Sequence, residues 1–147
     1  MLRRSLLAIL LGVLATPLLA QNPATPDFSG TWVFNPAQSQ PAKRVANRTE
    51  TIAIACTGQT IEFHFTTDGK ASTQAYLLDG KEHVGRVLGG SAVYGRAEWK
   101  GSVLVTKFRT DLFTFKTRWK LSSGGRVLIR SIEGPGHNNQ LLVYDKQ

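Results

Sequence analysis

The sequence predicts an all-β protein, an antiparallel up-and-down β-barrel of about eight to ten strands. Three observations predict this class. Short segments alternate apolar and polar residues, Gly-containing turn signals separate them, and after the first 20 residues no segment keeps an apolar period of 3.6 residues over three turns. Neighbour-to-neighbour hairpins favour the up-and-down barrel, which also leaves no exposed strand edge.

The chain begins with a segment typical of a secretory signal. Arg3 and Arg4 precede the run Leu6–Ala15, which contains no charged residue, and a small residue, Ala20, follows. This run is shorter than the roughly 20 apolar residues that a stable membrane anchor needs. We therefore expect a signal peptide over residues 1–20, cleaved after Ala20, a flexible leader over 21–27, a barrel domain over 28–147, and a mature protein that is periplasmic or secreted.

The first half of the barrel is predicted from alternation and turns. Cys56 alternates with Ile52 and Ile54, and Phe63 and Phe65 share one face of the next segment. Asp-Gly pairs at 68–69 and 79–80 supply the positive φ that tight turns require. The predicted strands are Gly30–Asn35, Glu50–Cys56, Thr60–Thr67 and Ala71–Leu78, and Lys81–Leu88 is either a further strand or a loop.

The second half follows the same logic. Turn signals lie at Lys100-Gly101-Ser102, Ser123-Gly124-Gly125 and Gly134-Pro135-Gly136. Between 113 and 121 the apolar side chains share one face of the strand and three basic side chains share the other. The predicted strands are Ala92–Trp99, Val103–Thr110, Phe113–Leu121, Arg126–Glu133 and Gln140–Lys146.

The positive charge is concentrated in one part of the chain. The formal net charge is +8, and removal of Arg3 and Arg4 would lower it to +6. The segment Lys100–Arg130 contains eight basic residues and one acidic residue. If the two strands inside it pair, one face gathers several cations, either as a solvated surface or as a site for an anionic envelope component. The candidate residues for that surface are Lys107, Arg109, Lys116, Arg118 and Lys120.

Phe28-Ser29-Gly30-Thr31-Trp32 resembles the Gly-x-Trp signature of lipocalins, or calycins. More specifically, the chain resembles small secreted bacterial lipocalin-like proteins of unassigned function, which share this start, an Asn-Pro-Ala-x-Ser link as at 35–39, and the stretches 78–83, 119–122 and 143–147. The resemblance implies a lipocalin-like barrel in which Gly30 and Trp32 are structural. It also implies that Trp32 stacks against a late cation, which is Arg118, Arg130 or Lys146.

Motifs for catalysis and for metal binding are absent from the sequence. His64, His83 and His137 are far apart and have no ligand spacing, and no nucleophile elbow or phosphate loop occurs. We therefore expect no enzyme, no cofactor and no metal site. Cys56 is either a small buried strand residue or, if exposed near a cation, a reactive thiol.

The aromatic residues suggest a ligand cavity. The candidates for its lining are Phe63, Phe65, Tyr94, Trp99, Phe113, Phe115 and Trp119. The alternative is that these rings fill a small barrel completely, because the interior of an eight-stranded barrel can be packed by side chains. We expect an exported monomer that binds a small apolar or amphipathic molecule. The alternative is a non-catalytic module that binds an anionic surface through Lys100–Arg130; nucleic acid and integral membrane insertion are not expected.

Overall fold

The computed structural model describes residues 25–41, 46–88, 91–122, 124–137 and 140–147. The predicted signal peptide and most of the predicted leader therefore lie outside the described residues. The described part contains ten strands in one antiparallel sheet. They are β1 (Gly30–Phe34), β2 (Glu50–Cys56), β3 (Thr60–Thr67), β4 (Lys70–Leu77), β5 (His83–Leu88), β6 (Ser91–Lys100), β7 (Val103–Arg109), β8 (Thr114–Leu121), β9 (Val127–Glu133) and β10 (Gln140–Lys146).

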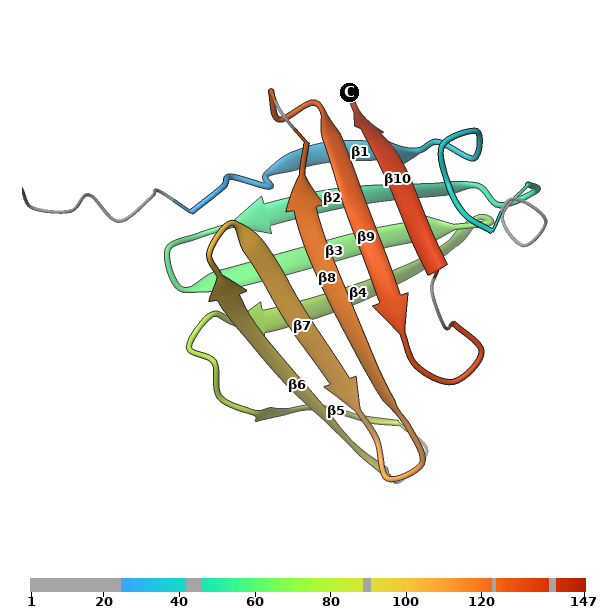
Figure 1. Ribbon diagram of the computed structural model, residues 1–147. Helices are drawn as coiled ribbons and strands as arrows, with labels where there is room; N and C mark the ends of the chain where they lie inside the picture. The colour runs from blue at the N-terminus through green and yellow to red at the C-terminus, as the bar shows by residue number, and fades with distance from the viewer. Residues whose placement is uncertain (1–24, 42–45, 89–90, 123, 138–139) are drawn as a thin grey trace, which may run out of the picture.

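The sheet folds back on itself as a nearly closed barrel. Its strand order is β4-β3-β2-β1-β10-β9-β8-β7-β6-β5, so β1 and β10 pair and the two halves of the chain meet. In Figure 1 the layer β1–β4 lies behind the layer β6–β10, and the strands of the two layers cross steeply. The barrel is not joined between β4 and β5, where Tyr76 packs over Gly95: a Cβ on that glycine would lie 3.2 Å from the ring.

The core between the layers is aromatic and densely packed. The Trp119 ring stacks on Phe63 with the centroids 4.4 Å apart, and Phe65 lies beside both rings. Trp119 is 1% exposed, and its Nε1 donates to the Thr106 hydroxyl at 3.1 Å, which satisfies the one polar group of the ring. In this part of the interior the aromatic rings therefore form a packed core and do not line a cavity.

Trp32 fills the interior at the end of the barrel where β1 begins. Its ring is completely buried, and its Nε1 donates to the Phe28 carbonyl at 2.9 Å. Lys146 Nζ lies 5.3 Å from the ring centroid, so Lys146 is the late cation that the resemblance left open. Gly30 makes this approach feasible, because a Cβ there would lie 3.1 Å from Cε of Lys146 and its φ is +128°.

The predicted all-β, up-and-down architecture is confirmed, and the strand bounds agree to within two residues. The ambiguous segment Lys81–Leu88 contains β5, which begins at His83, where the register with β6 starts opposite Gly95. No helix of the described residues is long and apolar enough to cross a membrane.

Candidate functional site

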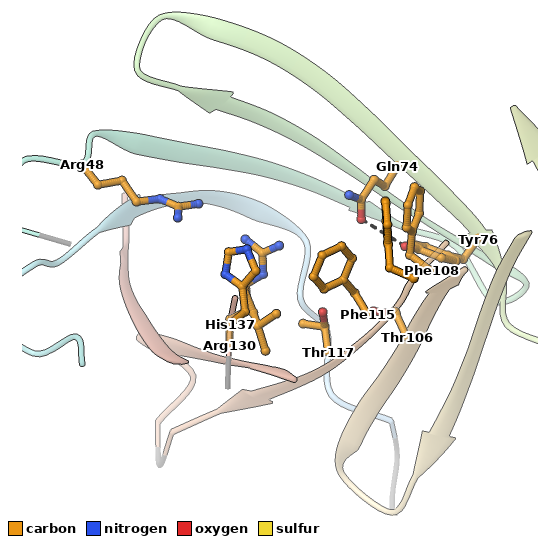
Figure 2. Close-up of a pocket in the computed structure, with 11 residues that line it drawn as sticks. Arg48, Gln74, Tyr76, Thr106, Phe108, Phe115, Thr117, Arg130 and His137 are labelled. Atoms are coloured by element: carbon orange, nitrogen blue, oxygen red, sulfur yellow. Dashed lines mark hydrogen bonds between the residues drawn. The ribbon is translucent and has the colours of Figure 1, made fainter. Parts of the chain in front are cut away.

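A cavity of about 280 Å³ is lined by residues of both layers, among them Phe108 and Phe113 beside the β7–β8 turn. We call it the Phe115 cavity. Figure 2 shows Phe115 and Thr117 between Arg48 on one side and Tyr76 and Phe108 on the other. Its lining residues are Arg48, Gln74, Tyr76, Thr106, Phe108, Phe113, Phe115, Thr117, Arg130, Ile132 and His137.

One wall of the cavity is aromatic. Phe108 on β7 and Phe113 in the following turn stack with centroids 6.3 Å apart, and Phe113 meets Phe115 of β8 at 5.0 Å. The His137 and Phe115 rings lie nearly perpendicular to each other with their centroids 5.4 Å apart. Each of the three Phe side chains is only partly buried. This wall therefore offers apolar surface that a small molecule could cover.

The other wall contains two arginines that share one buried carboxylate. Glu50, whose side chain is 1% exposed, accepts hydrogen bonds from Arg48 Nη2 at 2.5 Å and Thr67 Oγ1 at 2.5 Å through one oxygen. Its other oxygen accepts from the Tyr144 hydroxyl at 2.5 Å and from Arg130 Nη1 at 3.4 Å. We call these five residues the Glu50 cluster. It joins β2, β3, β9, β10 and the segment before β2.

The charge states in the cluster follow from its geometry. Burial by itself would raise the pKa of Glu50, but the Arg130 charge and the hydrogen bonds from Thr67, Tyr144 and Arg48 together lower it. Burial also raises the pKa of Tyr144 well above its ordinary value. At neutral pH the carboxylate is therefore ionised and the phenol is a neutral donor. Two guanidinium groups against one carboxylate leave the cluster with one net positive charge.

The arginines also retain unused hydrogen-bonding capacity. The Nε atoms of Arg48 and Arg130 are buried and have no hydrogen-bond partner among the described residues. Arg130 lies over the Phe65 and Trp119 rings, with Cζ 4.9 Å and 4.8 Å from their centroids, so the packed core supports it from one side. Arg48 and Arg130 line the Phe115 cavity and Glu50 does not, so the charged groups on this wall of the cavity are positive.

Tyr76 and Gln74 form the far end of the cavity. The Tyr76 hydroxyl donates to Gln74 Oε1 at 3.0 Å, and burial raises its pKa to about 12. Both residues, with Phe108, also line a second hollow of about 280 Å³ that reaches Gly85, Val93 and Gly95. Tyr76 therefore separates the Phe115 cavity from the unpaired boundary between β4 and β5.

Two of the seven predicted lining residues, Phe113 and Phe115, line the cavity. Phe63, Phe65 and Trp119 do point inward, but they stack on one another in the core. Trp99 packs against Phe28 at 5.2 Å, near the end of the barrel where β1 begins. Tyr94 does not line the cavity as predicted. It pairs with Arg109 across β6 and β7, and the Arg109 guanidinium lies 4.0 Å from its ring on the outer face of the barrel.

The sequence analysis missed the polar wall, although part of its signal was present. Glu50 is in phase with Ile52 and Ile54, and Arg130 is in phase with Leu128 and Ile132. A charged residue in phase with buried positions must be paired inside or face a cavity. Arg48 precedes its strand, so alternation gives no signal for it.

The five candidate cations do share one outer face, as the predicted hairpin requires. Lys107 lies directly opposite Lys116 in the β7–β8 register. Arg109 is held by Glu82 at 2.7 Å and Arg118 is paired with Glu133. Lys107, Lys116 and Lys120 form no ion pair with any described residue.

The remaining candidate groups form no site of their own. Cys56 is partly buried, and burial raises the pKa of its thiol, so the thiolate is not favoured. His64 lies 3.1 Å from Glu62 and His83 lies 2.9 Å from Asp79, both at the surface. Among the described residues no three His, Cys, Asp or Glu side chains gather in a metal-binding arrangement.

Comparison with known proteins identifies the fold. No protein-family model matches the sequence, and no curated protein is similar to it. Solved structures do match. The REP1-NXSQ fatty acid transporter has a TM-score of 0.63 at 13% identity over 81% of this chain and 95% of its own. Fatty-acid-binding protein 1 of Echinococcus granulosus has 0.62 at 13% over 81% and 96%, and the fluorescent protein UnaG has 0.62 at 15% over 82% and 97%. The chain therefore has the calycin-type β-barrel fold that these proteins share.

Proposed function

We propose that this protein binds a small amphipathic molecule in the Phe115 cavity. The apolar part of the ligand lies against Phe108, Phe113 and Phe115, and an anionic head group lies against Arg48 and Arg130. One observation carries the proposal: two guanidinium groups that share a single buried carboxylate face an aromatic cavity. Two structural neighbours, a fatty acid transporter and a fatty-acid-binding protein, support a ligand of this class.

The residual charge makes an anion the complementary head group. An anion placed against the guanidinium groups of Arg48 and Arg130 would neutralise the single net charge of the cluster. A neutral head group would leave that charge without a partner. Each charge-assisted hydrogen bond of this kind contributes roughly 1.5–3 kcal/mol.

The size of the cavity limits the ligand. At about 280 Å³, it lies just below the range of roughly 300–1,000 Å³ that ligand sites usually offer. A medium-chain carboxylate is therefore a better first probe than a long one. A rotation of Tyr76 would join the cavity to the second hollow and admit a longer chain.

The proposed role is binding without catalysis, in a protein that is exported. The arginine pair at residues 3–4 and the uncharged run Leu6–Ala15 support export. Expression of the full chain in a bacterial host, followed by mass measurement of the exported product, tests this part. A mature N-terminus at Gln21 is expected, and retention of the intact chain in the cytoplasm would contradict it.

Calorimetric titration with decanoate and with decanol tests the binding proposal. The two ligands share a chain length and differ in the charge of the head group, so decanoate should bind and decanol should bind at least about tenfold more weakly. Arg48→Gln should weaken decanoate about tenfold and leave decanol unchanged, because Glu50 keeps Arg130. Arg126→Gln, at an exposed position on the β8–β9 turn, is the matched control.

A second variant distinguishes ligand binding in the cavity from ligand binding at the surface of the protein. Thr117 is buried and lines the cavity, so Thr117→Phe should fill the space and abolish binding of both ligands. If Thr117→Phe and Arg48→Gln bind decanoate as the unaltered protein does, the ligand does not occupy this cavity and the proposal fails.

A further inference from the structure

The β7–β8 hairpin carries an exposed apolar side chain at its tip. Leu112 is 90% exposed, the most exposed of the large hydrophobic side chains in the described residues. The turn that presents it is ordered: the Thr110 hydroxyl accepts from the Leu112 and Phe113 amides at 3.2 Å, and the Thr110 amide bonds to the Phe113 carbonyl at 2.9 Å. Leu112 is therefore held outward by a defined turn.

A row of cations lies on the outer face beside this tip. Arg96, Lys107 and Lys116 are direct neighbours in register across β6, β7 and β8. Like charges directly opposite one another on neighbouring strands destabilise a sheet. The acidic residues around the row are Glu98, which pairs with Arg96 and Lys100, Glu82, which pairs with Arg109, Glu133, which pairs with Arg118, and Asp111 in the turn.

The two lysines at the centre of the row have acidic neighbours but no direct ion pair: the charge of Lys107 helps to lower the pKa of Glu82, and that of Lys116 helps to lower the pKa of Glu133. Lys107 and Lys116 form no ion pair with any described residue, and Glu133, opposite Lys116, is engaged by Arg118. Lys107 and Lys116 therefore lie opposite each other with like charges, and the two nearby carboxylates are already paired with Arg109 and Arg118. An external anion would relieve that repulsion.

The hairpin also borders the Phe115 cavity. Phe113 and Phe115, which flank Leu112 on the C-terminal side, line the cavity, as does Phe108 on the other strand. A surface that engaged the tip would thus lie next to the aromatic wall. An apolar side chain with lysines beside it can combine the two attractions that hold proteins at anionic bilayers, burial of apolar surface and attraction to the surface charge.

We infer that the β7–β8 hairpin docks on an anionic lipid bilayer, with Leu112 inserted among the lipids and Lys107 and Lys116 against their phosphates. The alkyl stems of the lysines can lie along the boundary while their ammonium groups reach the head groups. This docking goes beyond ligand binding in the cavity. None of Leu112, Lys107 and Lys116 lines the cavity, so the two proposals can fail separately.

Flotation of the full chain with vesicles tests the docking. Vesicles of phosphatidylcholine and phosphatidylglycerol in equal parts should bind the protein, and vesicles of phosphatidylcholine alone should not. Binding should weaken as salt is raised, since the attraction to surface charge is screened. Equal binding to both vesicle types would overturn the proposal.

Matched variants identify the surface. Lys107→Gln/Lys116→Gln and Leu112→Ser should each weaken vesicle binding about tenfold. Lys70→Gln/Lys81→Gln removes two exposed lysines elsewhere, and Val84→Ser removes an exposed apolar side chain, 65% exposed, on β5. These controls should bind normally.

The opposite results would overturn the inference. If the control pair loses as much binding as the hairpin pair, the attraction is a general effect of net charge. If soluble polyphosphate binds as tightly as the vesicles and Leu112→Ser has no effect, the partner is a polyanion and not a bilayer. All the altered side chains are exposed or partly exposed, and circular dichroism will verify that each variant is folded.

Discussion

Replacement of Glu50 by Gln tests the electrostatic logic of the interior most sharply. The amide preserves the shape of the side chain, but its single oxygen can accept from only one of Tyr144 and Thr67, which donate to different oxygens of Glu50. It also removes the carboxylate charge that Arg48 and Arg130 share. Removal of one partner of a buried ion pair costs about 3–5 kcal/mol. Here the Arg48 and Arg130 side chains keep 22% and 12% exposure, and Arg130 keeps its aromatic contacts.

We therefore expect Glu50→Gln to lower the free energy of unfolding by about 3 kcal/mol at pH 7, the lower end of that range. For a domain of this size the melting temperature should fall by roughly 10 °C. Urea unfolding followed by circular dichroism measures the difference. Glu62→Gln, on the outer face of β3 with a half-exposed side chain, is the matched control and should change stability by less than about 0.5 kcal/mol.

The effect depends on pH with a definite sign. The folded-state pKa of Glu50 is lowered from its ordinary value of 4.5, so its stabilising contribution is complete above that value. The contribution is lost as the pH falls through the folded-state pKa. The difference between the unaltered protein and Glu50→Gln should thus be largest near neutrality and shrink in acid. A difference that is absent at pH 7, or equally large at pH 3, would refute the reasoning.

The same variant should bind decanoate more tightly. Without Glu50 the cluster has two net positive charges, and one further unit charge about 5 Å from an anion is worth about 3 kcal/mol at an effective dielectric constant of 20, before desolvation. A tenfold gain in affinity for decanoate is a conservative expectation, with none for decanol. An unchanged ratio of the two affinities would show that Glu50 and the ligand do not share these arginines.

Two further substitutions test the aromatic wall and the core. Gly134→Ala would place a Cβ 2.3 Å from Cδ1 of Phe115 at a φ of +155°, so it should displace that ring and weaken decanoate binding about tenfold by calorimetry. Gly58→Ala, which meets nothing within 4 Å, is its control, and equal losses in both would contradict this reading. Trp119→Ala should destabilise the protein by about 3–5 kcal/mol in urea unfolding, because Trp119 is fully buried and stacked on Phe63. A loss below about 1 kcal/mol would show that the core does not depend on that stack.

The sequence predicted the barrel well because most strands bury one face. Ile61, Phe63 and Phe65 alternate with polar residues, so both the existence and the facing of β3 follow from the pattern alone. The extent of β5 is harder to predict, because pairing with β6 starts only at His83 and its register shifts between Val84 and Val87.

The site was harder to predict than the fold. Alternation tells whether a side chain points inward, but it gives no depth along the barrel, so Phe63 and Phe115 look alike in sequence although one lies in the core and the other lines the cavity. The facing of Tyr94 was predictable: it is in phase with Arg96 and Glu98 on the outer face. The ion pair of Glu50 with Arg130 joins residues that are 80 positions apart in the sequence, and only the pairing of β1 with β10 brings them together.

A structure of the protein with bound decanoate tests the central claim most directly. The account predicts a carboxylate within hydrogen-bonding distance of the guanidinium groups of Arg48 and Arg130, and an alkyl chain in contact with Phe113 and Phe115. A ligand bound with its carboxylate in solvent or outside the barrel, or a Phe115 cavity that stays empty at saturating decanoate, would contradict it.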